Sequence, residues 1–594
     1  MRTFTSIPGS VLCLSAVAFF CGCTSSRISH QPPTAGIATV KQDGASVSND
    51  QTIAALSAPV PYEMEKARSA FPEKRQMLEA FQMRGGGGAP MLGCKAVSFS
   101  AGTGAPAKIG YAASAGTIAQ QVTEFNTEGY DPVDENGFKN AADDPLSTFS
   151  IDVDKASYAN VRRFITSGSL PPIDAVRIEE MINYFSYSYP QPSGDAPFSI
   201  TTELGTCPWN TTHLLALVGI KGKNIATDNL PPGNLVFLLD VSGSMQSEDK
   251  LPLIQQAMKL LVENLRAQDH IAITVYAGAA GLVLPSTSGA DKRIITEAID
   301  RLSAGGSTAG SEGIELAYAT AKKNFIPHGN NRVILATDGD FNVGPSSDAE
   351  LVRLIEQKRS DGIFLTVLGF GTGNYKDSKM MKLADKGNGN YAYVDNLAEA
   401  RKVLVSEMGG TLLTIARDVK IQVEFNPATV ASYRLVGYEK RRLNNEDFND
   451  DTKDAGELGS GHTVTALYEI VSVGSLEKLA SVDPLKYQVR RASGETDELL
   501  TIKFRYKEPQ GDQSKLIEQV LRNQSSPASS ENFRFAAAVA GFGMLLRDSQ
   551  YKGGLTFDAV RSLAQGAQGS DNGGYRAEFL SLVRQAEALK KGSM

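Results

Sequence analysis

The sequence predicts an α/β protein in which a doubly wound, Rossmann-like domain is inserted in a β-sandwich-like domain. An apolar run, residues 235–239, lies between Pro231-Pro232-Gly233 and Asp240, which is typical of a strand buried on both faces of a parallel sheet. Strand-like and helix-like segments then alternate up to Met408. Further strand-like segments precede and follow this region, and a two-stranded ribbon alone would be marginal, so we expect them to share one sandwich. A helical C-terminal region and a disordered N-terminal tether complete the predicted fold.

The first residues predict export. Arg2, an apolar segment at 11–20 and Cys21-Gly22-Cys23 resemble a bacterial lipoprotein signal peptide over residues 1–23. The resemblance implies that cleavage leaves Cys23 as a lipid-bearing N-terminus, and Thr24 in place of Asp favours the outer membrane in a Gram-negative cell. The apolar segment is too short to span a bilayer as a mature anchor. We therefore expect a lipid-anchored envelope protein that faces the periplasm or the cell surface, with a soluble secreted protein as the alternative.

Residues 24–146 predict a flexible linker. Their composition turns to Ser, Thr, Ala, Gly and Gln, with Gly85-Gly-Gly-Gly88 as the most flexible point. Such a segment buries too little apolar area to offset the entropy lost on ordering. Apart from Cys23, only Cys94 and Cys207 remain in the mature chain. They could form one disulfide or remain free thiols.

An N-terminal segment, residues 147–230, is expected to combine helices and strands. Residues 149–153 alternate as a half-buried strand does, and residues 156–166 place apolar side chains on one helical face. Asp174 is expected to cap a second helix. Two strands follow, at residues 198–204 and 214–221.

The inserted α/β domain is expected at residues 231–408. Apolar side chains after the first strand recur at helical spacing and predict a helix that packs on the sheet: Leu251, Ile254, Met258, Leu261 and Leu265. Further strands are expected at residues 271–276, 282–284, 332–337, 363–368 and 391–394.

Two regions follow the inserted domain. Residues 411–510 predict a β-rich domain that packs with residues 197–222, and its strands are expected at residues 419–425, 433–438, 463–473 and 499–506. Residues 511–594 predict a helical region, with helices at residues 535–546, 557–563 and 575–589. The first of these is uncharged but too short to cross a membrane, so we expect it to be buried.

Polar side chains follow two strands of the predicted α/β sheet. Asp240, Ser242 and Ser244 come after the first strand, Asp338 follows the strand at 332–337, and a polar turn at Gly305-Gly306-Ser307-Thr308 precedes a helix. In an open α/β sheet the loops beyond the carboxyl ends of the strands form the ligand crevice. Hard oxygen ligands suit Mg²⁺ or Mn²⁺ better than zinc. These residues could otherwise only cap helices.

These three loops, in this order and spacing, resemble the von Willebrand factor A domain and its metal-ion-dependent adhesion site. Residue by residue, the resemblance implies that the metal is surrounded by Asp240, Ser242, Ser244, Thr308 and Asp338. The implied cation is Mg²⁺, with Mn²⁺ or Ca²⁺ as alternatives. In that family an open coordination position accepts an acidic side chain, so the implied partner is a protein that supplies one carboxylate.

The order of segments also resembles the bacterial YfbK-like lipoproteins. The resemblance rests on Thr148-Phe-Ser-Ile-Asp-Val-Asp-Lys-Ala-Ser-Tyr158, Thr337-Asp-Gly-Asp-Phe-Asn-Val-Gly344 and Ala466-Leu-Tyr468. It covers residues 147 to the C-terminus and implies no particular activity.

Composition and motifs exclude several functions. The net charge of −7 and the lack of a Lys/Arg cluster argue against nucleic-acid binding. None of the five histidines is followed by Glu, no G-x-S-x-G motif occurs, and Gly222-Lys223 is followed by Asn. We therefore expect a binding module and no enzyme; the alternatives are a scaffold or assembly adaptor of an envelope complex, or a hydrolase.

Overall fold

The apolar run before Asp240 forms the central strand β5 (Gly233–Asp240), in which every residue is buried. A computed structural model describes residues 128–226, 229–306, 310–339, 348–407, 413–453, 455–475, 497–524 and 529–592. The signal peptide expected at residues 1–23, with Cys23, lies outside the described residues, as do Cys94 and most of the expected linker.

The α/β domain is built on a sheet that, in the described part of the chain, has six strands in the order β10-β9-β8-β5-β6-β7. All neighbouring pairs are parallel except β6 and β7. The strands beside β5 are β6 (His270–Tyr276), β7 (Ala280–Ser288), β8 (Asn330–Thr337), β9 (Phe364–Phe370) and β10 (Tyr391–Val394). The chain continues from β5 to β6 on one side and returns through β8 on the other. The direction of winding therefore reverses between β5 and β8, which is where ligands bind in doubly wound sheets.

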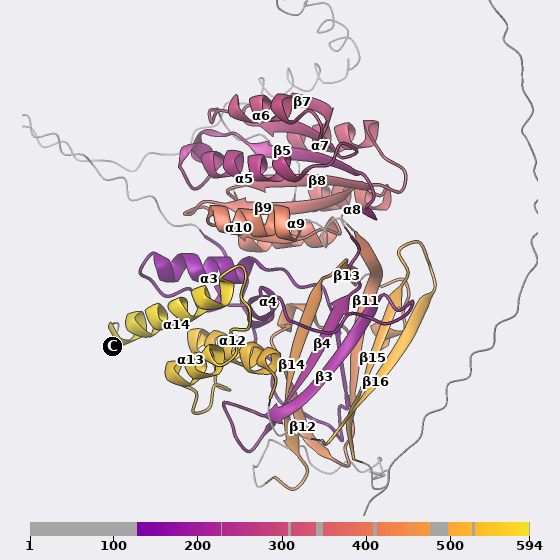
Figure 1. The fold of residues 1–594 in the computed structure, drawn as a ribbon, viewed down its shortest axis with the longest axis vertical. Coiled ribbons are helices and arrows are strands. Elements are labelled where there is room, and N and C mark those ends of the chain that lie inside the picture. The colour runs from indigo at the N-terminus through magenta and orange to yellow at the C-terminus, as the bar shows by residue number, and fades with distance from the viewer. Residues whose placement is uncertain are drawn as a thin grey trace, which may run out of the picture. The chain divides into compact units, whose positions relative to one another are not determined.

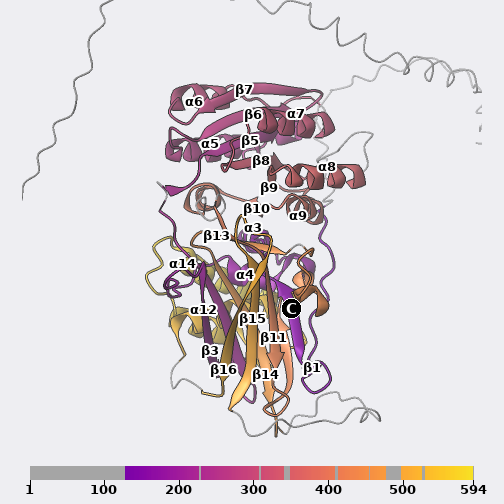
Figure 2. The same ribbon diagram turned by 90° about the vertical axis from the view of Figure 1, so that its right-hand side faces the viewer.

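Helices cover both faces of this sheet (Figures 1 and 2). One face carries α5 (Leu251–Asn264), α6 (Lys292–Asp300) and α10 (Leu397–Arg401), and the other carries α7 (Gly310–Lys323), α8 (Asp348–Ser360) and α9 (Asp377–Lys386). The apolar side chains predicted to face the sheet from α5 and from the residue after it are all buried. This arrangement confirms the predicted doubly wound fold.

Strands from before and after the α/β domain share two sheets. In the described residues, one sheet has the order β1-β12-β14-β4-β3, and the other has the order β13-β11-β15-β16 with β2 paired to β11. The early strands are β1 (Lys139–Asn140), β2 (Leu146–Ser150), β3 (Phe198–Thr206) and β4 (Leu214–Gly222). The late strands are β11 (Thr414–Phe425), β12 (Val430–Val436), β13 (Gly456–Gly459), β14 (Thr463–Ser472), β15 (Glu498–Lys507) and β16 (Ser514–Arg522). Because β4 pairs with β14, the α/β domain is inserted between strands of one sheet, as predicted.

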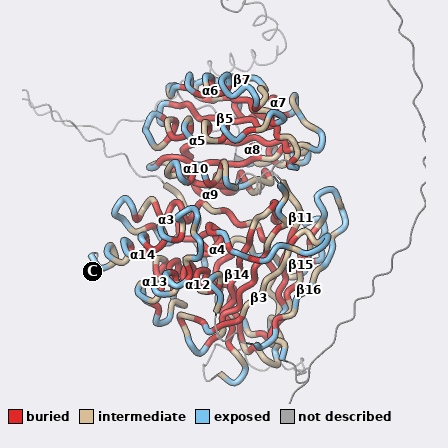
Figure 3. Tube along the Cα trace, viewed as in Figure 1, coloured by how far each residue is buried: buried red, intermediate tan, exposed pale blue. Residues whose placement is uncertain are grey.

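The inner faces of the two sheets enclose one apolar core, and helices cover the outer face of the first sheet. Buried strands run through both sheets in Figure 3. The covering helices are α3 (Ala156–Thr166), α4 (Ile178–Asn183), α12 (Glu531–Arg547), α13 (Phe557–Gln565) and α14 (Tyr575–Gly592). As expected, α12 is buried along most of its length. Among the described residues, none of the helices has the length and apolar character needed to cross a bilayer.

The N-terminal segment departs from the prediction at Asp174. This residue lies in a short 3-10 turn, Ile173–Ala175, and its carboxylate accepts a hydrogen bond from the backbone N–H of Val133. The helix α4 begins at Ile178, four residues after Asp174, and its N-cap residue Arg177 makes no side-chain cap. The prediction that Asp174 caps this helix was therefore wrong, because its carboxylate is hydrogen-bonded to the backbone N–H of Val133, which is distant in the sequence.

Part of the expected linker belongs to the fold. Residues 128–146 are described, and within them β1 pairs with β12. The Asn136 side chain donates hydrogen bonds to the backbone oxygens of Leu435 and Gly437, at 3.1 and 2.7 Å. A polar composition concealed this order, because the segment is held by long-range hydrogen bonds and by a few apolar contacts, such as those of Ala141 and Phe138, with residues distant in the sequence.

The helical C-terminal region begins later than expected. Residues 514–522, assigned to it from the sequence, form β16, an antiparallel partner of β15. Leu516, Ile517, Val520 and Leu521 have helix-like spacing. The turn around Gly511 instead folds the chain back along β15, so tertiary pairing overrides the local pattern.

Candidate metal centre

The candidate site lies at the carboxyl edge of the α/β sheet, where β5 and β8 end side by side. Asp240 is the last residue of β5 and Asp338 follows β8 directly, and both side chains are completely buried. Their strands are paired in parallel register from Gly233 opposite Asn330 to Leu239 opposite Ala336. The two carboxylates therefore emerge at the point where the winding reverses.

Hydrogen bonds fix the Asp240 carboxylate. Its Oδ1 accepts the backbone N–H of Ser242 at 2.9 Å, and its Oδ2 accepts the hydroxyl of Tyr276 at 2.9 Å. Burial raises the pKa of Asp240, and the nearby charge of Asp338 raises it further, while the bonds from Ser242 and Tyr276 act in the opposite direction. A positive charge at this point would favour the ionised carboxylate.

The two serines of the first loop lie together above the carboxylates. Their Oγ atoms are 3.0 Å apart; Ser242 is buried, whereas Ser244 is exposed. Ser242 therefore belongs to the buried base of the site, and Ser244 lies on its exposed side.

Backbone hydrogen bonds join the first loop to the second. Gly243 N–H donates to the Gly306 oxygen at 3.1 Å, and Gly305 N–H donates to the Val241 oxygen at 2.8 Å. Gly306 has a φ of +91°, which favours glycine. Thr308, the fifth predicted ligand, lies outside the described residues, but the turn that leads to it is held against the first loop.

The Asp338 carboxylate has two polar neighbours that the sequence did not indicate. Lys250 Nζ lies 3.0 Å from Asp338 Oδ2, and Asn374 Nδ2 lies 3.4 Å from the same oxygen. The Oδ1 atom of Asn374 is buried and has no hydrogen-bond donor among the described residues. The structure thus brings Asp240, Ser242, Ser244 and Asp338 into one site, with Lys250 and Asn374 beside Asp338.

These residues fit a hard divalent cation. In the described part of the chain, no group of three or more His, Cys, Asp or Glu side chains could hold a metal ion. A cation at this edge would therefore be bound by the two carboxylates together with hydroxyl and amide oxygens, which are the ligands that Mg²⁺, Mn²⁺ and Ca²⁺ accept. The unpartnered Asn374 oxygen beside Asp338 is consistent with such a site. That Asp240, Ser242, Ser244, Thr308 and Asp338 bind a metal stays a prediction.

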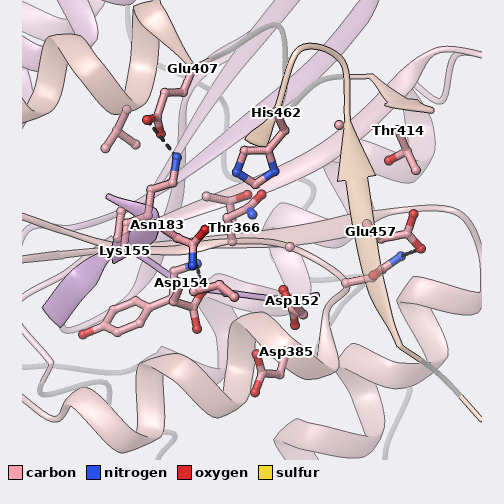
Figure 4. A pocket seen from close by; sticks show the side chains of 18 of the residues that line it. Asp152, Asp154, Lys155, Asn183, Thr366, Asp385, Glu407, Thr414, Glu457 and His462 are labelled. Atoms are coloured by element: carbon pink, nitrogen blue, oxygen red, sulfur yellow. Dashed lines mark hydrogen bonds and ion pairs between the residues drawn. The ribbon is translucent and has the colours of Figure 1, made fainter. Parts of the chain in front are cut away.

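A second polar site lies near the amino ends of β8 and β9, and Figure 4 shows side chains that line it. A cavity of about 490 Å³ is lined by Arg332 and Thr366, near the amino ends of β8 and β9, and by Glu457 and His462 from the other domain. Lys155 and Glu407, also in its wall, form an ion pair at 2.8 Å. Because Arg332 is near the start of β8 and Asp338 follows its end, the cavity is separate from the candidate metal centre.

Comparison with known proteins agrees with the fold. Residues 234–405 match the family model of the von Willebrand factor type A domain, and residues 124–217 match a model described as von Willebrand factor. Residues 410–589 match the model described as "Uncharacterized protein YfbK, C-terminal". The fold and these matches define the chain as a von Willebrand factor type A (VWA) domain protein.

The relatives identify the family within this class. The chain is 46% identical over 490 residues to YfbK of Escherichia coli (strain K12), a match that covers 81% of this chain and 84% of that protein. The chain therefore belongs to the YfbK family. It is also 29% identical over 156 residues to inter-alpha-trypsin inhibitor heavy chain H2 of Homo sapiens, covering 25% of this chain and 16% of that protein.

A solved structure of a von Willebrand factor type A protein from Catenulispora acidiphila matches with a TM-score of 0.38 and 16% identity. That match covers 65% of this chain and 90% of the other. At this TM-score it adds nothing to the assignment.

Proposed function

We propose that this protein is an envelope lipoprotein that binds a protein partner through a divalent cation in its VWA domain. The observation that carries the proposal is the pair of completely buried carboxylates, Asp240 and Asp338, at a sheet edge where the neighbouring loop residue Ser244 is exposed. Lys250 compensates one of these two buried charges, and the second is costly without further positive charge. The exposed position of Ser244 is the side from which an acidic side chain of the partner would reach the cation. Mg²⁺ is the proposed cation, with Mn²⁺ or Ca²⁺ as alternatives.

Binding, rather than catalysis, is the activity that the site supports. Asp240 and Asp338 are each held by hydrogen bonds or an ion pair at the base of the site, and the sequence contains neither a His-Glu pair nor a G-x-S-x-G motif. A scaffold or assembly adaptor of an envelope complex would use the same site as a regulated contact.

Loss of the Asp240 carboxylate tests the metal. The chain from residue 24 is melted in EDTA and in increasing MgCl₂. We expect Mg²⁺ at about 100 times its Kd to raise Tm by about 2–4 °C in the wild type and not in Asp240→Ala. Asp300→Ala, which removes an exposed carboxylate that pairs only with Lys259 on the described surface, should respond as the wild type does. An equal rise of Tm in Asp240→Ala would refute the metal site.

Membrane preparations test the anchor and the partner together. Cells that express the wild type or Cys23→Ala are fractionated, and proteins are crosslinked and captured with this chain in Mg²⁺ or EDTA. We expect the wild type to fractionate with membranes and to retain a partner only in Mg²⁺, because the cation bridges the two proteins. Cys23→Ala should lose the membrane association. A partner that is retained equally in EDTA would favour a constitutive scaffold instead.

A further inference from the structure

Lys250 is an unusual neighbour for a site that would bind a cation. It is the residue before α5, it is 8% exposed, and its ammonium group lies 3.0 Å from Asp338 Oδ2. Lysine is rarely this buried unless its charge is paired. Here the paired carboxylate belongs to the candidate metal centre itself.

The position of the ammonium group is built into the fold. The backbone N–H of Lys250 donates to the Ser247 oxygen at 3.0 Å, and its carbonyl accepts the first hydrogen bond of α5, from Ile254 at 2.9 Å. Its alkyl chain lies against Gly371, where a Cβ atom would overlap it. Gly371 has a φ of +72°, so both the space and the backbone require glycine there. The backbone hydrogen bonds of Lys250 and the contact of its alkyl chain with Gly371 thus both hold the ammonium group beside Asp338.

Charge gives Lys250 a role toward the metal. Among the described residues at the base of the site, Asp240 and Asp338 each carry one negative charge and Lys250 carries one positive charge. The fixed ammonium group of Lys250 beside Asp338 repels a divalent metal ion that binds the same carboxylate. Counted over these three described side chains, a bound divalent ion would leave one net positive charge, which favours the approach of one further carboxylate.

We propose that Lys250 is a positioning residue of the candidate metal centre that neutralises Asp338 and thereby weakens the binding of a divalent cation. The inference rests on the proposed function, because it assumes that Asp240 and Asp338 bind the ion. Lys250 lowers the affinity of the site for the metal. In return, it stabilises the site when no metal is bound and attracts the partner's carboxylate when a metal is bound. Removing its charge has two opposite effects: tighter metal binding and lower stability in EDTA.

Neutral substitutions test this role. Mg²⁺ and Mn²⁺ are titrated by calorimetry into the chain from residue 24 as wild type, Lys250→Gln and Lys250→Met, and Tm is measured in EDTA. Gln is included because its amide can still donate a hydrogen bond to Asp338, so this variant should fold even if Met does not. We expect both variants to bind Mg²⁺ about tenfold more tightly than the wild type, and to melt at lower temperature in EDTA.

Lys259→Met is the matched control. It removes a lysine of α5, the helix that follows Lys250, and the ion pair of Lys259 with Asp300 is well exposed, so the metal affinity of this variant should equal that of the wild type. Unchanged or weaker Mg²⁺ binding by Lys250→Gln, with binding intact in the wild type and lost in Asp240→Ala, would overturn the role of Lys250 alone. If the wild type binds neither ion, the proposed metal site fails as well.

Discussion

Asp240 of the candidate metal centre is completely buried. Folding removes its carboxylate from water, and the hydrogen bonds from Ser242 and Tyr276 compensate only part of the cost. Asp338 adds a second buried charge close by. A divalent cation at this point would offset the free-energy cost of burying both carboxylates. Loss of the Asp240 carboxylate is therefore the decisive test of the site.

His462 shows a different consequence of burial. Its imidazole faces the cavity below the α/β sheet (Figure 4). Burial lowers its pKa, and the nearby charges of Lys155, Lys221 and Lys402 lower it further, against the opposing charge of Glu407, to about 3. The histidine therefore stays neutral in the folded protein across the physiological range.

The pKa of His462 predicts a loss of stability in mild acid. An unfolded histidine has a pKa of about 6.5, so as pH falls below that value the unfolded chain takes up a proton that the folded chain refuses until about pH 3. The stability that depends on His462 is thus complete above pH 6.5 and declines from there toward pH 3. At pH 5 the loss should be about 1–2 kcal/mol, which allows for partial hydration of the cavity.

Urea unfolding at pH 7 and pH 5 measures this effect. His462→Asn should lose about 1–2 kcal/mol less stability between the two pH values than the wild type, because Asn does not titrate. His328→Asn removes an exposed histidine from a turn with positive φ, a conformation that Asn tolerates, and should follow the wild type. Parallel losses in all three proteins would contradict the assigned role of His462.

At the residue scale, the sequence predicted the site residues that directly follow strands and missed the site residues that reach the site from other segments of the chain. Asp240, Ser242, Ser244 and Asp338 come together because parallel strands end at one edge. Tyr276 ends β6, the neighbouring strand, and the same rule could have found it. Lys250 carries no such signal, because only the path of the chain into α5 brings it to Asp338.

At the element scale, the loop between β9 and α9 links the candidate metal centre to the N-terminal segment. Asn374 of this loop contacts Asp338, and the preceding Gly373 donates its backbone N–H to Glu128 at 3.0 Å. Arg163 of α3 holds the same carboxylate with two hydrogen bonds, at 2.9 and 2.8 Å. Burial acts to raise the pKa of Glu128, but these hydrogen bonds and the opposite charge of Arg163 lower it. The ion pair between Glu128 and Arg163 therefore stays charged.

The contrast between β10 and β16 shows which elements the sequence could predict. β10 forms at residues 391–394 as expected, because a short apolar run bounded by turn residues has one suitable place in a parallel sheet. β16 has the apolar spacing of a helix and becomes a strand only because β15 offers it a partner. Both strands lie at the edge of a sheet, but β10 is fully buried and β16 is mostly exposed, so local pattern predicts buried elements well and exposed elements poorly.

At the scale of the whole folded unit, buried arginines join the α/β domain to the segments that flank it. Arg162 of α3 pairs with Asp395 and Glu399, which lie after β10. Arg441, after β12, pairs with Asp154 at 2.7 Å and with Asp385 of α9 at 3.0 Å. Composition gave no indication of these contacts, because each partner is distant in sequence and only the insertion of one domain in the other brings them together.

Arg177 is the most buried of these links. Its guanidinium is 1% exposed, and it donates to Asp377 Oδ2 of α9 at 2.7 Å and to Glu180 Oε2 of α4 at 3.1 Å. Tyr391 of β10 donates its hydroxyl to the same Asp377 at 2.9 Å. Removal of the guanidinium leaves the Asp377 carboxylate buried without its cation, which costs about 3–5 kcal/mol.

Differential scanning calorimetry of the chain from residue 24 tests whether these links make the two domains unfold together. We expect one transition in the wild type, and in Arg177→Met a lower Tm with two separable transitions, because the α/β domain then loses a contact that the sandwich and its helices share. Arg293→Met removes an arginine that is 80% exposed in its pair with Glu297, so its stability should change by less than about 0.5 kcal/mol. A single transition in Arg177→Met, within about 1 °C of the wild type, would show that the domains are coupled by other contacts and that the arginine links are incidental to the cooperativity of the fold.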